Sequence, residues 1–390
     1  MGAVRKGRVI VAGHICLDVI PDLSASRELR FVPGTMSGIG PVTVSTGGSV
    51  PNTGLSLYRL GAEVSLLAKI GDDPFGKMVR DSIARADKKL AEGLLVSPGE
   101  HTACTIILSP PGEDRMFLHY SGANASFSSG DLPEDLPEAD IFHFGYPQVM
   151  HRMYQNGGEE MRRMFDRAKN AGLTTSLDTS YPDLSSEAGE ADWRGIFENT
   201  LPAVDVFLPS LEEILVMLEP EYRKLATRDP TRLAQAPIED IRRLGERLLG
   251  MGAAIVGIKA GSRGMYLRTS SERRLKSANL PVDLSAWAGR EMWSSVFEAT
   301  VVGTVGAGDA AVAGLLFGLL NSMQPEKALT AACAAGASAV EAADATSGVR
   351  SWGDIESRII EGWQRDERQP DQGWSASKYP GVWSGPRDQR

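Results

Sequence analysis

Short apolar runs rich in β-branched residues recur along the chain, with amphipathic stretches between them. Six of these runs are expected to be buried strands, at residues 8–12, 64–70, 141–144, 173–177, 204–208 and 254–258. The expected helices include residues 52–60, 75–86, 159–171, 238–250, 308–320 and 326–343. Because this alternation is typical of a parallel sheet covered by helices, the sequence predicts an α/β fold with a doubly wound, mostly parallel sheet.

Two regions depart from the alternation. Residues 17–45 and 102–120 alternate apolar and polar positions and contain Pro and Gly, which is typical of antiparallel strands outside a buried sheet. We expect them to form a small β-rich lid. Residues 219–236 and 269–299 are rich in charge, Pro or scattered Trp, and we interpret them as insertions between core elements.

The end of the chain is more polar than the rest. We expect residues 1–363 to form one domain and residues 364–390 to form a polar C-terminal tail. The tail also contains Trp374, Tyr379 and Trp383. It is therefore expected either to be disordered or to dock, on the surface of the domain or on a neighbouring subunit.

Charge and cysteine content narrow the functional classes. The formal net charge is −9 and the basic residues are scattered, which argues against a nucleic-acid partner. The early apolar run 9–13 is too short for a signal peptide or a membrane span. Cys16, Cys104 and Cys333 form no CxxC pair, and the five histidines have no metal-ligand spacing. The sequence therefore predicts a cytoplasmic protein without a membrane partner.

The strongest local feature is a glycine-rich loop that precedes a helix of small apolar residues. Residues 304–309 read TVGAGD and are followed by AAVAGLL at 310–316. Gly306 and Gly308 allow the backbone to approach a ligand, and the free amides of a helix start attract negative charge. Asp309 beside such an anion site could take a proton from an attacking hydroxyl. The alternative is that Asp309 only caps the helix.

The run 304–309 resembles the C-terminal signature of the ribokinase-like, or PfkB, carbohydrate kinases. This resemblance implies a ribokinase-like fold in which Asp309 is the catalytic base. It also implies that the backbone amides of Gly306, Ala307 and Gly308 form an anion hole.

Earlier segments agree in order and spacing with the N-terminal signature of the same family. They are Gly47-Gly48 followed by Asn52, and the run GDDPFG at 71–76. Asp18, near the end of a first strand segment at 9–18, matches an early acidic residue that binds sugar hydroxyls. The substrate-contacting residues that the resemblance implies are Asp18, Gly47, Gly48 and Asn52. Without it, the two glycines could be a simple turn and Asn52 a helix cap.

A third segment, KAGSRG at residues 259–264, resembles the family's GxxG turn, which follows a core strand and lies against the nucleotide. The ATP-contacting residues that the resemblance implies are Lys259, Gly261, Gly264, Thr304, Gly306 and Gly308.

Several positions depart from the family pattern. Gly303 replaces the acidic or amide residue that usually precedes the Thr, which argues against the monovalent-cation site of some members. Ser210 replaces the Asn of the Asn-x-x-Glu motif, whereas its Glu is retained as Glu213. Ser180 and Pro182 stand where an Asn and an Arg are usual.

The retained Glu213 implies a role in holding Mg²⁺ through water. The alternative is that Glu212 and Glu213 are only solvated charges in the first turn of a helix, where acidic residues are favoured.

The expected function is transfer of the ATP γ-phosphoryl group, with Mg²⁺, to a hydroxyl of a sugar, sugar acid or nucleoside, with a primary alcohol preferred. An unphosphorylated sugar is favoured because no basic cluster lies near residues 47–52. The alternatives are a nucleoside kinase of the same fold and a catalytically weak sugar- or nucleotide-binding regulatory relative. A dinucleotide-dependent oxidoreductase is disfavoured, since no GxGxxG follows the first strand. The resemblance also implies a homodimer formed through the lid.

Overall fold

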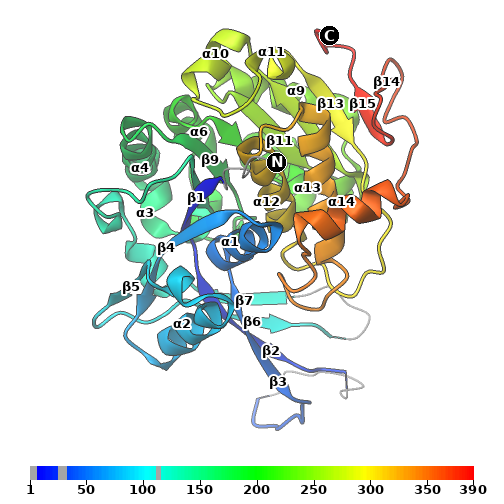
Figure 1. The fold of residues 1–390 in the computed structure, drawn as a ribbon. Coiled ribbons are helices and arrows are strands. Elements are labelled where there is room, and N and C mark those ends of the chain that lie inside the picture. Colours follow the sequence, from blue (N-terminus) through cyan, green and yellow to red (C-terminus); the bar gives the residue numbers. More distant parts are fainter. Residues whose placement is uncertain (1–6, 25–32, 111–115) are drawn as a thin grey trace.

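The computed structural model describes residues 7–24, 33–110 and 116–390. Within them, the main sheet has eleven strands in the order β14-β15-β13-β12-β11-β10-β9-β8-β1-β4-β5, with helices on both faces (Figure 1). Neighbouring strands from β5 to β11 are parallel, and the other four extend one edge in antiparallel pairing. The strands are β1 (Arg8–Gly13), β4 (Glu63–Gly71), β5 (Leu94–Ser97), β8 (Ile141–Gly145), β9 (Thr174–Asp178), β10 (Val206–Phe207), β11 (Ile255–Lys259), β12 (Met265–Thr269), β13 (Glu291–Ser294), β14 (Ser375–Ala376) and β15 (Val382–Ser384). The predicted α/β fold with a large, mostly parallel sheet is confirmed.

Each of the six predicted strands is present, and the six predicted helices correspond to α1, α2, α4, α9, α12 and α13. The helices are α1 (Ser49–Leu60), α2 (Pro74–Ala86), α3 (His151–Tyr154), α4 (Glu159–Asn170), α5 (Glu187–Glu190), α6 (Trp193–Thr200), α7 (Leu211–Leu218), α8 (Pro220–Ala226), α9 (Ile238–Gly250), α10 (Glu272–Ser277), α11 (Leu284–Trp287), α12 (Ala307–Leu320), α13 (Pro325–Ala339) and α14 (Trp352–Ile360). Helices α2, α4 and α9 each bury one apolar side, which periodicity detects, whereas α12 and α13 are runs of small helix-forming residues buried on nearly all sides.

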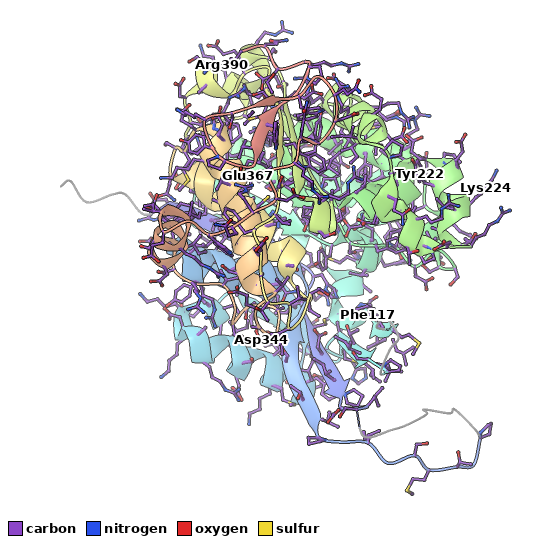
Figure 2. All side chains as sticks on the ribbon, turned by 90° about the vertical axis from the view of Figure 1, so that its right-hand side faces the viewer. Phe117, Tyr222, Lys224, Asp344, Glu367 and Arg390 are labelled. Atoms are coloured by element: carbon purple, nitrogen blue, oxygen red, sulfur yellow. The ribbon has the colours of Figure 1, made fainter. Side chains whose placement is uncertain are left out.

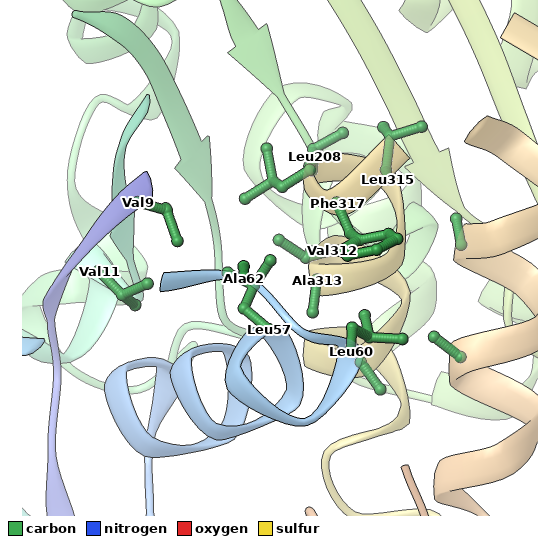
Figure 3. Packing of buried hydrophobic residues seen from close by; sticks show 14 of the residues in the cluster. Val9, Val11, Leu57, Leu60, Ala62, Leu208, Val312, Ala313, Leu315 and Phe317 are labelled. Carbon is green, nitrogen blue, oxygen red and sulfur yellow. The ribbon is translucent and has the colours of Figure 1, made fainter. Parts of the chain in front are cut away.

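The sheet divides the hydrophobic core into two layers. In β1, Val9 and Val11 point to the layer under α1, α12 and α13, whereas Ile10 and Ala12 point to the layer under α4, α6 and α9. Figure 3 shows the first layer, where the side chains of β1, α1 and α12 meet. Burial on both faces explains why the central strands read as continuous apolar runs.

Helix α12 is held closely against α13. A Cβ atom on Gly314 would lie 2.5 Å from the carbonyl oxygen of Ala331, and one on Gly318 would lie 2.7 Å from the Cβ atom of Ala328. Only glycine allows the two backbones to approach this closely. The packing fixes the position of the first turn of α12, which carries the glycine-rich loop.

A separate small sheet projects from the main sheet at the lower end of the view in Figure 1. Its strand order is β3-β2-β6-β7, formed by β2 (Cys16–Pro21), β3 (Val42–Gly47), β6 (Cys104–Leu108) and β7 (Met116–Tyr120). Both predicted lid regions therefore contribute strands, although residues 25–32 and 111–115 of these regions lie outside the described residues. β2 and β6 pair in parallel, so the expectation of purely antiparallel strands is wrong.

The predicted strand segment 9–18 is two strands in two sheets. β1 ends at Gly13, whose φ of 126° breaks the strand, and β2 begins at Cys16 in the small sheet. A Cβ atom on Gly13 would lie 2.4 Å from the carbonyl oxygen of Gly145, so a larger residue does not fit at this crossing. In the sequence, Gly13-His14 is the only sign of this break between two apolar runs.

The interpretation of residues 269–299 as an insertion is wrong in part, because they contain the buried strand β13 between β12 and β15. The strand was not predicted because the charged Glu291 at its start is unusual in a buried strand. The Glu291 carboxylate accepts hydrogen bonds from Arg242 Nε at 2.9 Å and from the Tyr266 hydroxyl at 3.0 Å, which compensate its burial. By contrast, residues 219–236 form α8 and a short 3₁₀ segment (Pro230–Gln235) at the periphery, where Tyr222 and Lys224 are labelled in Figure 2.

The C-terminal tail contributes strands to the main sheet. Val382–Ser384 (β15) pairs with β13, and Trp374 is buried against Tyr266 with a distance of 6.4 Å between ring centroids. Of the two alternatives for the tail, docking on the surface of the domain is the one that the structure shows. Among the helices of the described residues, none has the length and hydropathy needed to cross a membrane.

Candidate active site

The carboxyl ends of the central strands, the start of α1 and the start of α12 meet at one edge of the main sheet, beside the small sheet (Figure 1). α12 begins at Ala307, directly after Gly306, whose φ of 76° lies in the left-handed region. A Cβ atom on Gly306 would lie 2.4 Å from the carbonyl oxygen of Ala345, so the turn requires glycine. This turn places Asp309 on the first turn of α12, with its side chain buried.

The carboxylate of Asp309 is held by three hydrogen bonds. Asn52 Nδ2 donates to Oδ2 at 3.1 Å, the Thr53 hydroxyl donates to Oδ1 at 3.2 Å, and the Tyr146 hydroxyl donates to Oδ2 at 2.8 Å. Burial raises the pKa of Asp309 to about 6, although these donors and the charge of Lys259 oppose the rise. A carboxylate with this pKa is a stronger proton acceptor than an exposed one and is still ionised at neutral pH.

The amides of the glycine-rich loop have the arrangement of an anion site. Ala307 N–H bonds to the Thr304 carbonyl at 3.4 Å, and Ala310 N–H bonds to the Gly306 carbonyl at 2.8 Å. In the described part of the chain, the amides of Gly308 and Asp309 between them have no hydrogen-bond acceptor. Unpaired amides at a helix start attract anions, which is the property predicted for this loop.

A cavity of about 460 Å³ opens beside the loop. Of the residues predicted to contact ATP, five line it: Lys259, Gly261, Gly264, Thr304 and Gly308. Gly306, the sixth, does not line the cavity; it forms the left-handed turn before α12. The far wall is apolar and includes Val296, Phe297, Ala311 and Val340. An apolar slot that ends at a cation and free amides has the polarity of a nucleotide, with an apolar base and anionic phosphates.

Lys259 is buried at the polar end of this cavity. Its Nζ forms an ion pair with Asp178 and donates to the Leu208 carbonyl at 2.6 Å. Burial alone lowers the pKa of Lys259, but the carboxylates of Asp178, Glu213 and Asp309 more than offset this, and the net pKa is raised. The ammonium group is therefore a permanent positive charge near Gly308 and Asp309.

On the other side of Asp309, the small sheet presents a polar face. Asp18 of β2, Thr105 of β6 and His119 of β7 are paired in one row across the strands. Asp18 is buried, and burial raises its pKa to about 6. A Cβ atom on Gly47 would lie within 2.5 Å of the Asp18 carboxylate, so this glycine leaves room for the side chain. Gly48 has a φ of 96° and would similarly meet the His14 carbonyl.

Several buried polar atoms around this face lack a hydrogen-bond partner among the described residues. They are both ring nitrogens of His14, the Ser49 hydroxyl and Asn52 Oδ1. Asn52 thus uses its amide nitrogen on Asp309 and leaves its oxygen unpaired. Because unpaired buried polar groups are unfavourable, such a cluster is a candidate for binding a polar ligand.

The sequence interpretation missed four residues of this site: His14, Thr53, Tyr146 and Asp178. His14 and Tyr146 directly follow β1 and β8, Asp178 is the last residue of β9, and Thr53 lies in the second turn of α1. The positions of the first three at the carboxyl ends of strands could have indicated them. Tyr146 also has a φ of 66°, which is unusual for a bulky residue. The ring of His14 lies 6.2 Å from the Tyr146 ring and 5.0 Å from the His119 ring.

The side chains of Glu213 and Glu212 lie in different environments, the first in a helix cap and the second at the cavity. The Glu213 carboxylate accepts from the Ser210 N–H at 2.9 Å and from the Thr179 hydroxyl at 2.7 Å, and thereby completes a capping box at the start of α7. Glu212 lines the cavity, and burial raises its pKa. No group of three or more potential metal ligands occurs within the described ranges.

The departures at Gly303 and Ser180 have local explanations. A Cβ atom on Gly303 would lie 2.9 Å from the Ala342 carbonyl oxygen, so a longer residue would require a shift of this backbone. The Ser180 hydroxyl donates to Gln148 Oε1 at 3.4 Å, beside the bond from its backbone amide to the same oxygen at 2.9 Å. Nothing in the described structure explains Pro182 at the position of the usual Arg.

The sheet order and the small second sheet define the ribokinase-like fold. Arabidopsis thaliana ribokinase complexed with ribose and ATP has a similar structure, with a TM-score of 0.67, 17% identity and coverage of 90% of this chain and 98% of that chain. A fructokinase from Xylella fastidiosa with bound ATP gives a TM-score of 0.65 and 20% identity, with coverage of 91% and 98%.

Sequence comparison extends the likeness. The chain is 25% identical over 336 residues to the ATP-dependent ribose-1-phosphate kinase of Halopiger xanaduensis, which covers 85% of this chain and 90% of that protein. It is 28% identical over 180 residues to fructokinase-2 of Solanum lycopersicum, and this match spans 45% of this chain and only about half (51%) of the relative. The model of the pfkB family carbohydrate kinases matches residues 6–352. The chain belongs to this family.

Proposed function

We propose that this protein transfers the γ-phosphoryl group of ATP to a hydroxyl of a sugar or sugar-like molecule. The observation that carries the proposal is the position of Asp309. Its buried carboxylate accepts a bond from Asn52, which belongs to the cluster of unpaired polar atoms with His14 and Ser49. It also lies in the same first turn of α12 as Gly308, which lines the cavity. Membership of the pfkB family supports the same reaction.

The residues of the site have distinct roles in this proposal. An acceptor hydroxyl donates to the Asp309 carboxylate, which takes its proton as the oxygen attacks the γ-phosphorus and the bond from that phosphorus to the departing ADP breaks. The amides of Gly308 and Asp309 and the charge of Lys259 stabilise the phosphoryl oxygens. Mg²⁺, when bound, supplies charge neutralisation of the nucleotide phosphates, and Glu213 would hold it through water. Closure of the small sheet over the acceptor excludes water.

The polar groups on the acceptor side favour an unphosphorylated sugar. Asp18, Asn52 and Ser49 are suited to hydroxyl groups, since they offer hydrogen-bond acceptors and donors without positive charge. Burial lowers the pKa of His14 well below its usual value, so its imidazole is neutral. The Halopiger relative acts, by its name, on ribose 1-phosphate. A phosphorylated acceptor would need cationic partners that these four residues do not supply.

The first test is the Asp309→Asn variant. The asparagine oxygen can keep the bonds from Asn52 and Tyr146, and its amide can face the Thr53 hydroxyl, which is able to accept. The fold and ATP affinity should therefore persist. We expect turnover to fall by about two to four orders of magnitude, the usual contribution of a general base.

The measurement is ATP consumption with Mg²⁺ and a panel of sugars, sugar acids and nucleosides, with calorimetry of ATP binding as the control. Wild-type turnover in Asp309→Asn would show that another group is the base. If no member of the panel is phosphorylated while ATP still binds, the regulatory alternative would be favoured.

We also propose a homodimer formed through the small sheet. Its outer face carries the apolar row Val44, Val19, Ile106 and Leu118, which pair across the four strands. Val44, Ile106 and Leu118 are 41%, 39% and 58% exposed. An apolar sheet face left in water is a candidate interaction surface.

A further inference from the structure

One wall of the nucleotide cavity consists of the segment between β13 and the glycine-rich loop. Val296, Phe297, Ala299 and Val301 of this segment line the cavity. The segment has no helix or strand of its own, so its position depends on what packs behind it. The residues behind it belong to the C-terminal extension 353–390, which follows the range matched by the family model.

Backbone contacts attach the extension to this wall. The Glu298 amide donates to the Gln364 carbonyl at 2.8 Å, and the Ser295 amide donates to the Gly381 carbonyl at 3.0 Å. Phe297 and Arg365 also form an isolated antiparallel bridge. Two separate parts of the extension therefore hold the wall segment, much as an added strand would.

Side chains of the extension pack on Phe297 itself. The Trp363 ring lies 4.6 Å from the Phe297 ring, and the Arg365 guanidinium carbon lies 4.3 Å from the same ring centroid. Trp363 is held in turn by its Nε1–H, which donates to the Glu298 carbonyl at 2.6 Å. The Arg358 guanidinium lies 3.7 Å from the Trp363 ring. These contacts leave Phe297 buried, with only 4% of its surface exposed.

Arg365 is an unusual residue to find in this place. It donates to the Ser294 hydroxyl at 2.6 Å and to the Ser295 carbonyl at 2.5 Å, while no carboxylate forms an ion pair with it among the described residues. Its charge is instead satisfied by the aromatic face and by backbone carbonyls. All of these bonds come from Arg365 Nη2, which also donates to the Gly381 carbonyl at 3.3 Å, whereas the buried Nε has no hydrogen-bond partner among the described residues. Nη2 therefore links the wall segment to the extension.

We propose that the C-terminal extension is a structural part of the nucleotide site, with Trp363 and Arg365 as positioning residues for Phe297 and the wall that receives the nucleoside of the phosphate donor. The inference rests on the proposed function, since it requires that ATP occupies this cavity. Coupling is reciprocal: a docked extension strengthens ATP binding, and bound ATP stabilises the docked extension.

The test compares two tryptophans of the same extension. Trp363 touches the cavity wall, whereas Trp374 is buried on the opposite core layer against Tyr266. We expect Trp363→Leu to raise the Kd for ATP by about three- to tenfold, the scale of losing one aromatic and cation–π contact. Trp374→Leu should lower the thermal midpoint by at least as much as Trp363→Leu does, but it should leave the Kd for ATP within twofold of the wild-type value.

Calorimetry with ATP and Mg²⁺, in the absence of any acceptor, measures both variants independently of turnover. An unchanged Kd in Trp363→Leu, or an equal rise in Trp374→Leu, would overturn the inference while the proposed kinase activity stands. A wild-type protein that does not bind ATP would overturn both. Should Trp363→Leu not fold, hydrogen exchange of the wild type decides: ATP should slow exchange of the Glu298 and Ser295 amides, and no slowing contradicts the proposal.

Discussion

At the scale of single residues, ionisation of the Asp309 carboxyl group is less favourable in the folded protein than in the unfolded chain. Its pKa is raised to about 6, whereas an unfolded aspartate has a pKa of about 4. Between about pH 4 and about pH 6 the native state binds more protons than the unfolded chain. The ionised carboxylate therefore lowers the free energy of unfolding by its full amount above about pH 6, and this destabilisation disappears as the pH falls towards 4. Asp309→Asn removes this loss, so its thermal midpoint at pH 8 should not fall below that of the wild type.

Tyr146 adjusts this carboxylate. Its backbone is held at a φ of 66°, an unfavourable conformation for a bulky residue, and its hydroxyl lies 2.8 Å from Asp309 Oδ2. A donor to the ionised form lowers a pKa, so we expect Tyr146→Phe to raise the pKa of Asp309. Because the base works only when deprotonated, the acid limb of kcat/KM should move from near pH 6 to higher pH.

The pH profile of kcat/KM with the best acceptor measures this shift, and Tyr58→Phe is the matched control. The Tyr58 hydroxyl also bonds to an aspartate, Asp87, at 3.3 Å, but it does so on the surface. The control should leave the limb in place. If Tyr146→Phe lowers activity equally at every pH, its role is structural only.

At the scale of single elements, the start of α7 combines a structural and a proposed functional role. Glu213 completes the capping box through Oε2, and glutamine can accept the same two bonds. Glu213→Gln should therefore change the thermal midpoint little. If Glu213 holds Mg²⁺ through water, the variant should raise the Mg²⁺ concentration for half-maximal rate several-fold, since hard cations prefer carboxylate oxygens.

A magnesium titration of Glu213→Gln beside Glu212→Gln separates the roles. Glu212 lines the cavity but takes no part in the cap, so Glu212→Gln is a control that removes the same charge at the adjacent position. A larger shift in Glu212→Gln would move the metal role to Glu212. No shift in either variant would leave Glu213 with its capping role alone.

The elements also show what sequence reasoning could and could not predict. Helices such as α9 (Ile238–Gly250) were predicted to the residue because their apolar periodicity is local information. Strand β13 was missed because the charge of Glu291 is compensated by Arg242, which is distant in sequence. At the site, the loop around Asp309 was predicted from its glycines. The donors Thr53 and Tyr146 were not, because only the tertiary fold brings them to the carboxylate.

At the scale of the whole molecule, the small sheet has one polar and one apolar face, because successive side chains along its strands point to opposite sides. Asp18 and Thr105 point to the candidate active site, and their neighbours Val19 and Ile106 point away from it. The strands project from the body of the molecule in Figure 1, and Phe117 of the edge strand β7 is labelled in Figure 2. A sheet with one polar functional face needs a cover for its apolar face, and a second copy of the same sheet would supply one.

The homodimer proposal predicts the effect of a charge on this outer face. Leu118 is 58% exposed and lies opposite Ile106, so Leu118→Asp should fold normally but place a carboxylate in the proposed interface. We expect wild type to sediment as a dimer and the variant to dissociate with a Kd at least about tenfold higher, because a desolvated, unpaired charge is strongly unfavourable. Val302→Asp, on a similarly exposed apolar residue of the main body (60%), is the control and should stay dimeric. Sedimentation across a concentration series decides: a monomeric wild type, or a Leu118→Asp dimer of unchanged affinity, would contradict this interface.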